Sequence, residues 1–184
     1  MPDACVACDM RRLPRRPSFA PRHLLYRVVS SHRQDSRLPF LHAVLVGFLL
    51  LLRPWPQVGK VALVTGGDSG IGRAVCYCFA QEGATVAFTY VKAQEFKDAN
   101  DTLQMLRQIK KQDAKDPIAI PADLGYEENC RRVVDEVVYA YGRIDILVNN
   151  AAEQYERSCI TDITEEQLER VFRTNIFSYM HVSK

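Results

Sequence analysis

Residues 60–72 read Lys-Val-Ala-Leu-Val-Thr-Gly-Gly-Asp-Ser-Gly-Ile-Gly. The opening apolar, β-branched run is typical of a strand that is buried in a parallel sheet. The glycines that follow predict a tight turn, because glycine tolerates backbone conformations that other residues avoid. Residues 70–81 then carry apolar side chains at helical spacing, namely Ile71, Ala74, Val75, Cys78 and Phe79. A strand, a glycine turn and a helix in this order predict the start of a βα-repeat.

The same alternation of strands and helices continues along the chain. We expect further strands over residues 84–90, 117–121 and 144–148. We expect helices over residues 98–112 and 127–141, and a last helix that starts at a capping box formed by Thr164 and Gln167. This order predicts an α/β fold with a doubly wound parallel sheet of the Rossmann type.

The charge of the chain divides it into two parts. Residues 1–57 hold nine Arg, no Lys and three acidic residues, whereas residues 58–184 hold fifteen basic and nineteen acidic residues. We therefore expect an unassigned Arg- and Pro-rich leader over 1–57, joined to a partial dinucleotide-binding domain over 58–184. The mildly acidic body gives no reason to expect nucleic-acid binding.

The leader contains a short apolar run over residues 40–52. Crossing a bilayer takes about 20 apolar residues, so a membrane anchor is disfavoured. Three alternatives stay open for the role of the leader. It could be a segment without a function of its own, an organelle transit peptide or a structured functional segment. Cys5 and Cys8 lack the second ligand pair that a zinc site needs, and we expect no metal site. The cysteines fit a reducing compartment, so we expect a cytoplasmic protein, with an organelle as the alternative.

The glycine turn is the candidate cofactor site. A turn at the start of a helix brings backbone N–H groups and the positive end of the helix dipole to a pyrophosphate. The residues that we assign to this site are Gly66, Asp68, Ser69, Gly70, Ile71 and Gly72. The second strand ends without an acid and is followed by Lys92. NAD sites usually place an acid there, so NADP is favoured over NAD, although Lys92 could also be an ordinary solvated lysine.

Three motifs resemble the short-chain dehydrogenase/reductase family. The run Thr65–Gly72 matches its T-G-x-x-x-G-I-G turn, and Asp123-Leu124 matches its D-[LV] pair. Residues 149–152 read Asn-Asn-Ala-Ala and match its N-N-A-G motif, with Ala in place of the final Gly. The resemblance covers residues 59–184, which would be the N-terminal half of the Rossmann domain. The amino-acid sequence of residues 60–75 is similar to that of the plant glucose and ribitol dehydrogenase homologues.

The resemblance implies roles for particular residues. Asp123 and Leu124 would contact the adenine, and Asn149, Asn150 and Ala151 would line the nicotinamide side. Asn175 would be the catalytic Asn, which holds a water in a proton relay. From the residues alone, Asp123 could instead cap a helix. Asn175 could instead be a satisfied core amide on a buried face with Leu168, Val171, Phe172 and Tyr179.

The resemblance implies hydride transfer between the nicotinamide and a carbonyl or alcohol of a sugar or polyol. Members of the family form homo-oligomers, and the sequence leaves the oligomeric state of this chain open. The family's chemistry uses a Ser and a Tyr with a Lys four residues later, and no tyrosine of this sequence has a lysine at that spacing. Tyr179 and Lys184 are five residues apart and would point to different faces of a helix. We therefore expect this chain alone to be inactive and unstable, with the strand near residue 148 left as a bare sheet edge.

Two other functions stay open. One is a cofactor-binding or partner-binding module without turnover. The other is a different Rossmann-like class such as a methyltransferase, which the Asn-Asn-Ala-Ala run and Asn175 disfavour.

Overall fold

A computed structural model describes residues 24–27, 57–91 and 95–184 of the chain. Five strands form one sheet in the order β1-β5-β2-β3-β4, and every neighbouring pair is parallel. The strands are β1 (Leu24–Arg27), β2 (Val61–Val64), β3 (Thr85–Tyr90), β4 (Ile118–Pro121) and β5 (Ile146–Asn149). The doubly wound parallel sheet is therefore confirmed.

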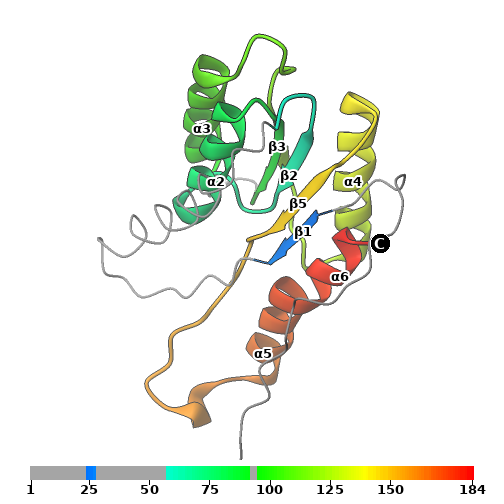
Figure 1. Cartoon of the computed structure of the whole chain (residues 1–184). Helices are drawn as coiled ribbons and strands as arrows, with labels where there is room; N and C mark the ends of the chain where they lie inside the picture. The colour runs from blue at the N-terminus through cyan, green and yellow to red at the C-terminus, as the bar shows by residue number, and fades with distance from the viewer. Residues whose placement is uncertain (1–23, 28–56, 92–94) are drawn as a thin grey trace, which may run out of the picture.

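Helices cover both faces of the sheet (Figure 1). One face carries α2 (Gly70–Gln81) and α3 (Phe96–Ile109), and the other carries α4 (Glu127–Tyr141) and the C-terminal helical run. That run consists of α5 (Glu165–Phe172), the π-helical segment η2 (Arg173–Phe177) and α6 (Ser178–Val182), and a 3-10 turn η1 (Ile160–Asp162) precedes it. None of the helices in the described ranges is long and apolar enough to cross a membrane.

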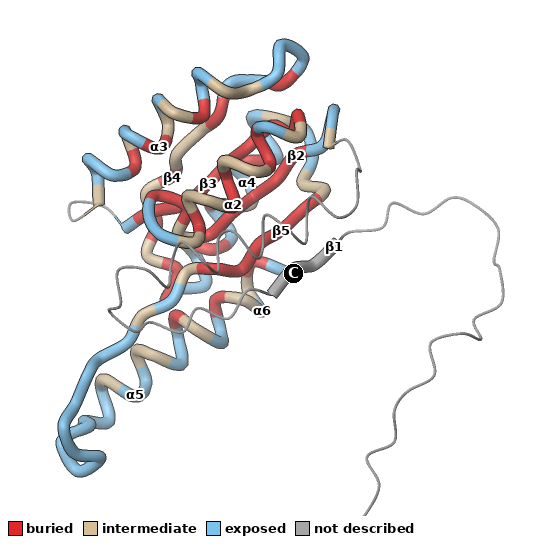
Figure 2. Tube along the Cα trace, turned by 60° about the vertical axis from the view of Figure 1, so that its left-hand side comes forward, coloured by how far each residue is buried: buried red, intermediate tan, exposed pale blue. Residues whose placement is uncertain are grey.

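The strands are apolar because each side of the sheet faces a helix layer. β2, β3 and β5 are buried along their whole length, as the red tube in Figure 2 shows. Phe88 packs with Val75 and Leu106 on the α2–α3 side, whereas Leu63 packs with Val133 on the α4 side. The sheet thus lies between two apolar cores. Because its strands are parallel, their carboxyl ends lie at one edge of the sheet.

The edge of β5 is paired, so our expectation that it would be bare is wrong. β1 lies within the Arg- and Pro-rich leader and pairs with β5 from Leu24 opposite Ile146 to Arg27 opposite Asn149. Parallel pairing satisfies backbone groups of β5 that would otherwise have no strand partner. The apolar run 40–52 and the Cys5–Cys8 pair lie outside the described residues.

The last helix is less buried than its apolar pattern indicates. Leu168 and Phe172 are about half exposed, at 52% and 47%, which contradicts the buried face that we expected. The physical reason is that the run packs on α4 only near its C-terminus, where Ser178 and Val182 are buried. α5 projects past the end of the sheet, as Figures 1 and 2 show.

Candidate functional site

The glycine turn joins β2 to α2 at the carboxyl edge of the sheet. Gly66 and Gly70 have positive φ angles, at 63° and 50°, in the region that favours glycine. Gly72 must be glycine for a steric reason instead, since a Cβ there would lie 1.9 Å from the Gly66 carbonyl oxygen and 2.6 Å from Asn150 Nδ2. A Cβ on Gly70 would meet nothing within 4 Å, so the turn is open on that side. The turn therefore leaves its backbone accessible to a ligand.

The start of α2 presents unpaired donors. Arg73 N makes the first helical hydrogen bond, to the Ser69 carbonyl. The N–H groups of Gly70, Ile71 and Gly72 have no acceptor within the described part of the chain, and Ser69 makes no side-chain cap. Three free amides at the positive end of a helix dipole are the donors that an anionic diphosphate requires. The residues of this turn thus fit a dinucleotide cofactor.

The segment after β5 is tied to the glycine turn. Asn150 Nδ2 donates to the carbonyls of Thr65 and Gly66, at 2.9 Å each. The Thr65 hydroxyl accepts from the backbone N–H groups of Asn150 and Ala151, at 2.9 and 3.0 Å. Asn150 thus satisfies backbone groups, whereas Asn149 Oδ1 is buried without a partner among the described residues.

Thr89 supports the same turn from β3, and the sequence pattern did not single it out. Its hydroxyl accepts from Gly66 N at 3.1 Å, and its carbonyl accepts from Gly67 N at 3.0 Å. Neither bond has a local sequence signal, because they join residues more than twenty positions apart.

Asp68 is the most buried acid of the turn, with 2% of its surface exposed. Its Oδ2 atom has no hydrogen-bond partner among the described residues. Burial and the nearby Glu95 carboxylate raise the pKa of Asp68. Its carbonyl accepts from Arg73 Nε and the Thr102 hydroxyl, so its backbone is fixed from two helices. An orphaned buried oxygen beside free amides is a position where a ligand donor could bind.

An acidic side chain lies at the end of β3, although no acid stands there in the sequence. Glu95 Oε2 accepts from Val91 N at 2.8 Å, so a carboxylate returns to the strand end where we expected no acid. Lys92, our candidate for a 2′-phosphate contact, lies outside the described residues.

Asp123 and Leu124 follow β4 at the same edge of the sheet, and Leu124 is buried. Asp123 Oδ1 accepts from Gly125 N at 3.0 Å and from Arg170 Nη2 at 2.9 Å. Arg170 Nε also donates to Glu153 Oε2 at 2.9 Å, and these carboxylates raise the pKa of Arg170. Arg170 and Glu153 were not predicted, because their partners come from three separate elements.

Asn175 lies in the centre of η2 and is half-buried. Its Oδ1 accepts from Glu153 N at 2.8 Å, and its Nδ2 donates to the Glu153 carbonyl at 2.9 Å. The amide is therefore satisfied by backbone, as in the alternative that we left open for it. This pair of bonds fixes η2 to the segment that follows β5.

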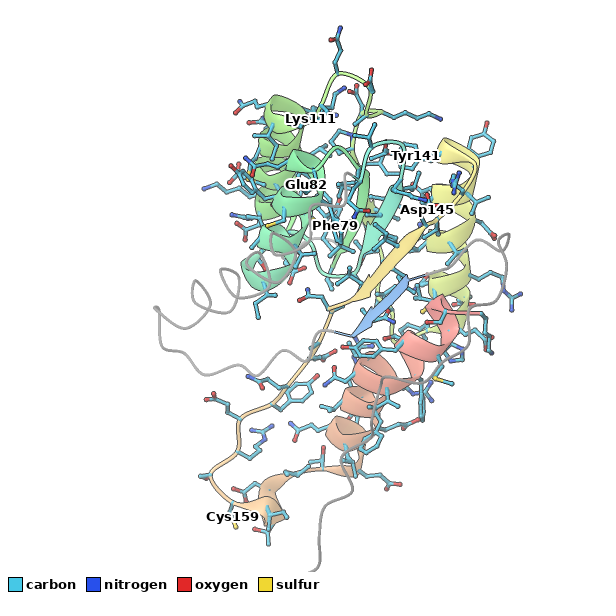
Figure 3. The ribbon with its side chains drawn as sticks, viewed as in Figure 1. Phe79, Glu82, Lys111, Tyr141, Asp145 and Cys159 are labelled. Atoms are coloured by element: carbon cyan, nitrogen blue, oxygen red, sulfur yellow. The ribbon has the colours of Figure 1, made fainter. Side chains whose placement is uncertain are left out.

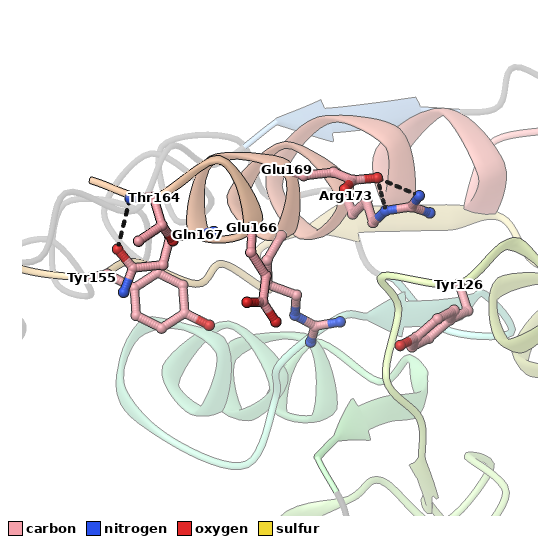
Figure 4. Close-up of a pocket in the computed structure, with 8 residues that line it drawn as sticks. Tyr126, Tyr155, Thr164, Glu166, Gln167, Glu169 and Arg173 are labelled. Atoms are coloured by element: carbon pink, nitrogen blue, oxygen red, sulfur yellow. Dashed lines mark hydrogen bonds and ion pairs between the residues drawn. The ribbon is translucent and has the colours of Figure 1, made fainter. Parts of the chain in front are cut away.

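A cavity of about 700 Å³ opens beside α5 (Figure 4). Its walls carry both signs of charge and two aromatic side chains. The lining residues are Tyr126, Tyr155, Thr164, Glu166, Gln167, Glu169, Arg170 and Arg173. Two of its lining residues contact the candidate site, since Arg170 binds Asp123 and Glu153 and the Tyr155 hydroxyl donates to Glu153.

The described cysteines differ in their burial. Cys76 and Cys130 are buried, and burial raises the pKa of each thiol, to about 11 for Cys130. Cys159 is exposed at the far tip of the loop before α5 (Figure 3). No cluster of metal-binding side chains occurs within residues 24–27, 57–91 and 95–184.

Comparison with known proteins gives consistent matches. The short chain dehydrogenase family model matches residues 60–184. The chain is 73% identical over 126 residues to NADPH-dependent aldehyde reductase 1, chloroplastic, of Arabidopsis thaliana, covering 68% of this chain and 44% of that protein. It is 76% identical over 127 residues to a glucose and ribitol dehydrogenase homolog of Oryza sativa subsp. japonica, covering 68% and 42%. The chain thus spans less than half the length of these curated relatives.

A solved structure shares the fold. A short chain dehydrogenase from Burkholderia cenocepacia in complex with NADP superposes with a TM-score of 0.62 at 33% identity, covering 70% of this chain and 50% of that one. The glycine turn, the parallel sheet and the residues matched by the family model all indicate the same family. The chain belongs to the short-chain dehydrogenase family.

Proposed function

We propose that this chain binds a nicotinamide dinucleotide across the carboxyl edge of the sheet, with NADP(H) preferred over NAD(H). The carrying observation is the set of free amides of Gly70, Ile71 and Gly72 at the start of α2. A bound nicotinamide dinucleotide supplies or accepts a hydride. In this proposal Asp123 and Leu124 contact the adenine, and Asn149 to Ala151 line the nicotinamide side.

Two comparisons support the preference for NADP(H), and one structural feature opposes it. The Arabidopsis relative is named NADPH-dependent, and the solved neighbour holds NADP. Glu95 places a carboxylate at the end of β3, where it would repel a 2′-phosphate. Because Glu95 accepts a backbone hydrogen bond from Val91, part of its charge is already compensated, and Lys92 would supply a base nearby.

For the whole enzyme we propose an oxidoreductase that acts on the carbonyl or hydroxyl group of a sugar or polyol. The names of the rice and Arabidopsis relatives support an aldehyde, sugar or polyol substrate. The proposal assigns cofactor binding to this chain but not turnover, because the sequence holds no Tyr-x-x-x-Lys pair. A cofactor-binding module without turnover is therefore the second candidate function.

The test is a titration of the full chain with NADPH and NADH, followed by nicotinamide fluorescence. We expect binding of both, with NADPH tighter. Gly72→Ala should abolish binding, because its Cβ would lie 1.9 Å from the Gly66 carbonyl oxygen. Gly59→Ala is the control for backbone strain alone, since its φ of 76° favours glycine whereas a Cβ there meets nothing within 4 Å and lies outside the turn. It should lower stability but keep cofactor binding.

Two results would contradict these proposals. Absence of binding of both cofactors by the folded chain would refute the cofactor site. Oxidation of NADPH with an aldehyde, or reduction of NADP with ribitol or glucose, would refute the assignment of binding without turnover.

The organelle alternative for the leader also stays a proposal. The Arabidopsis relative is named chloroplastic. Residues 1–57 fused ahead of a fluorescent protein should direct it to an organelle in plant cells, and diffuse fluorescence would contradict this.

A further inference from the structure

The cavity beside α5 has the size of a small-molecule site. Its volume is about 700 Å³, and small-molecule sites commonly span roughly 300–1,000 Å³. Most of its lining side chains come from α5, and Tyr126 at the start of α4 and Tyr155 after β5 complete the wall. Figure 4 shows the two tyrosines at opposite ends of the row of lining side chains, with Glu166 between them. The cavity therefore has room for a ligand beside Glu166.

Both arginines of the cavity wall are already paired with carboxylates. Arg173 Nε and Nη2 donate to Glu169 Oε1, at 3.0 and 2.6 Å. Arg170 donates to Asp123 and to Glu153, at 2.9 Å each. An anionic ligand would have to compete with these carboxylates for the guanidinium groups, so the cavity is a poor site for a phosphate or a carboxylate.

Glu166 is a lining carboxylate without a cation beside it. Its side chain makes no hydrogen bond and no ion pair with the residues that the structure describes, and the residue is exposed. It lies in the first turn of α5, where the helix dipole favours a negative charge, so the carboxylate stays ionised. The charge left uncompensated at the cavity wall is therefore negative, and it favours a cationic ligand.

Tyr155 supplies an aromatic ring near this carboxylate. Its hydroxyl donates to Glu153 Oε1, and 43% of the residue is exposed. The hydrogen bond to Glu153 raises the pKa of Tyr155, and the nearby Glu166 carboxylate adds to this shift. Tyr155 thus stays uncharged at neutral pH, and the face of its ring attracts a cation that lies within about 6 Å of the ring centre.

We propose that the cavity beside α5 binds a small organic cation, whose ammonium group lies against the carboxylate of Glu166 and the ring face of Tyr155. A metal ion would need several ligating side chains in one group, and no such group occurs in the part of the chain that the structure describes. The site is separate from the proposed cofactor site, because none of residues 66–72 lines the cavity.

The experiment titrates choline into the full chain by isothermal titration calorimetry, at constant ionic strength and without a nicotinamide cofactor. The comparison ligand is the uncharged alcohol of the same shape, in which a carbon atom replaces the quaternary nitrogen of choline. An exposed ion pair and an exposed cation–π contact each add up to about fivefold in affinity, so choline should bind at least about fivefold more tightly than the alcohol.

Two pairs of variants test the two groups that we assign to the cation. Glu166→Gln should weaken choline binding about fivefold, whereas Glu165→Gln should change it by less than about twofold. Glu165 is the matched control, because it lies in the same turn of α5 but does not line the cavity. Tyr155→Leu should bind choline about threefold more weakly than Tyr155→Phe, because both lose the bond to Glu153 and only phenylalanine keeps the ring.

Three results would overturn the inference, provided that circular dichroism shows the parent fold in each protein. Absence of choline binding would show that the cavity is no cation site. Equal binding of choline and the uncharged alcohol would show an apolar pocket without selection for charge. Equal losses of choline affinity in Glu166→Gln and Glu165→Gln would show attraction to the surface charge as a whole.

Discussion

Replacing Asn150 with alanine is the most direct test of how the candidate site is held together. Its Nδ2 donates two hydrogen bonds of 2.9 Å, to the carbonyls of Thr65 and Gly66. Asn150→Ala removes both donors and leaves these carbonyls in a region where Asn150 itself is only 9% exposed. An unsatisfied buried acceptor costs about 1–3 kcal/mol, and partial access of water to Gly66 lowers its share. We expect a loss of about 2 kcal/mol in the free energy of unfolding.

The assay is thermal unfolding followed by far-ultraviolet circular dichroism, with NADPH titration on the same samples. For a body of this size, about 2 kcal/mol corresponds to a melting temperature roughly 8 °C lower. NADPH binding should weaken as well, because the Gly66 carbonyl lies against Gly72 at the start of the turn.

The control is Asn100→Ala. Asn100 is half-buried on α3 and its side chain has no hydrogen bond with the described residues, so its replacement should change stability by less than about 0.5 kcal/mol. Equal melting temperatures for Asn150→Ala and the parent chain would refute the reasoning. A larger loss of stability for Asn100→Ala than for Asn150→Ala would refute the reasoning too.

Three further predictions follow from the same contacts. Removing residues 1–56 deletes β1 and exposes the edge of β5, so the shortened chain should self-associate at concentrations where the full chain does not; a monomer by light scattering would contradict this. Glu95→Gln should favour NADPH over NADH by about threefold more than the parent chain does, since it removes a carboxylate from the end of β3, and an unchanged ratio by titration would count against it. Asp145, labelled in Figure 3, is partly buried, yet its bonds to Val61 N and Arg143 lower its pKa below the ordinary 3.8. Its carboxylate therefore stabilises the fold above pH 3.8 and loses this effect as the pH falls through the folded-state pKa; Asp145→Asn should flatten the acid limb of stability against pH, and parallel limbs would exclude this contribution.

The local elements could be predicted from the sequence, because their signals lie within a few neighbouring residues. The apolar run of β2, the glycine turn and the stripe of α2 are each read from spacing alone, and the capping box at Thr164 and Gln167 is formed as expected. One boundary moved where contacts in the following loop decide it. α3 ends at Ile109 because Lys110 leaves the helical conformation, and its ammonium donates to the Ala114 carbonyl.

β1 could not be predicted, because nothing in its own four residues distinguishes it from the rest of the leader. Leu24–Arg27 lies between segments rich in Arg and Pro, and its pairing is with residues more than one hundred positions away. Strand pairing of that kind depends on an available partner edge and not on local periodicity.

Asn175 shows why a matched motif position does not by itself give a chemical role. The resemblance assigns Asn175 a place in the site, but its role depends on which hydrogen-bonding positions of its side chain are free. Its Oδ1 and Nδ2 atoms each make one bond to the backbone of Glu153, which uses one of two acceptor positions and one of two donor positions of the amide. The π-helical geometry of η2 also changes the hydrogen-bond pattern of the helix backbone at this residue. The amide of Asn175 and the guanidinium of Arg170 thus meet at Glu153 and fasten the last helix to the sheet edge, so the segments that follow β4 and β5 are held by one network.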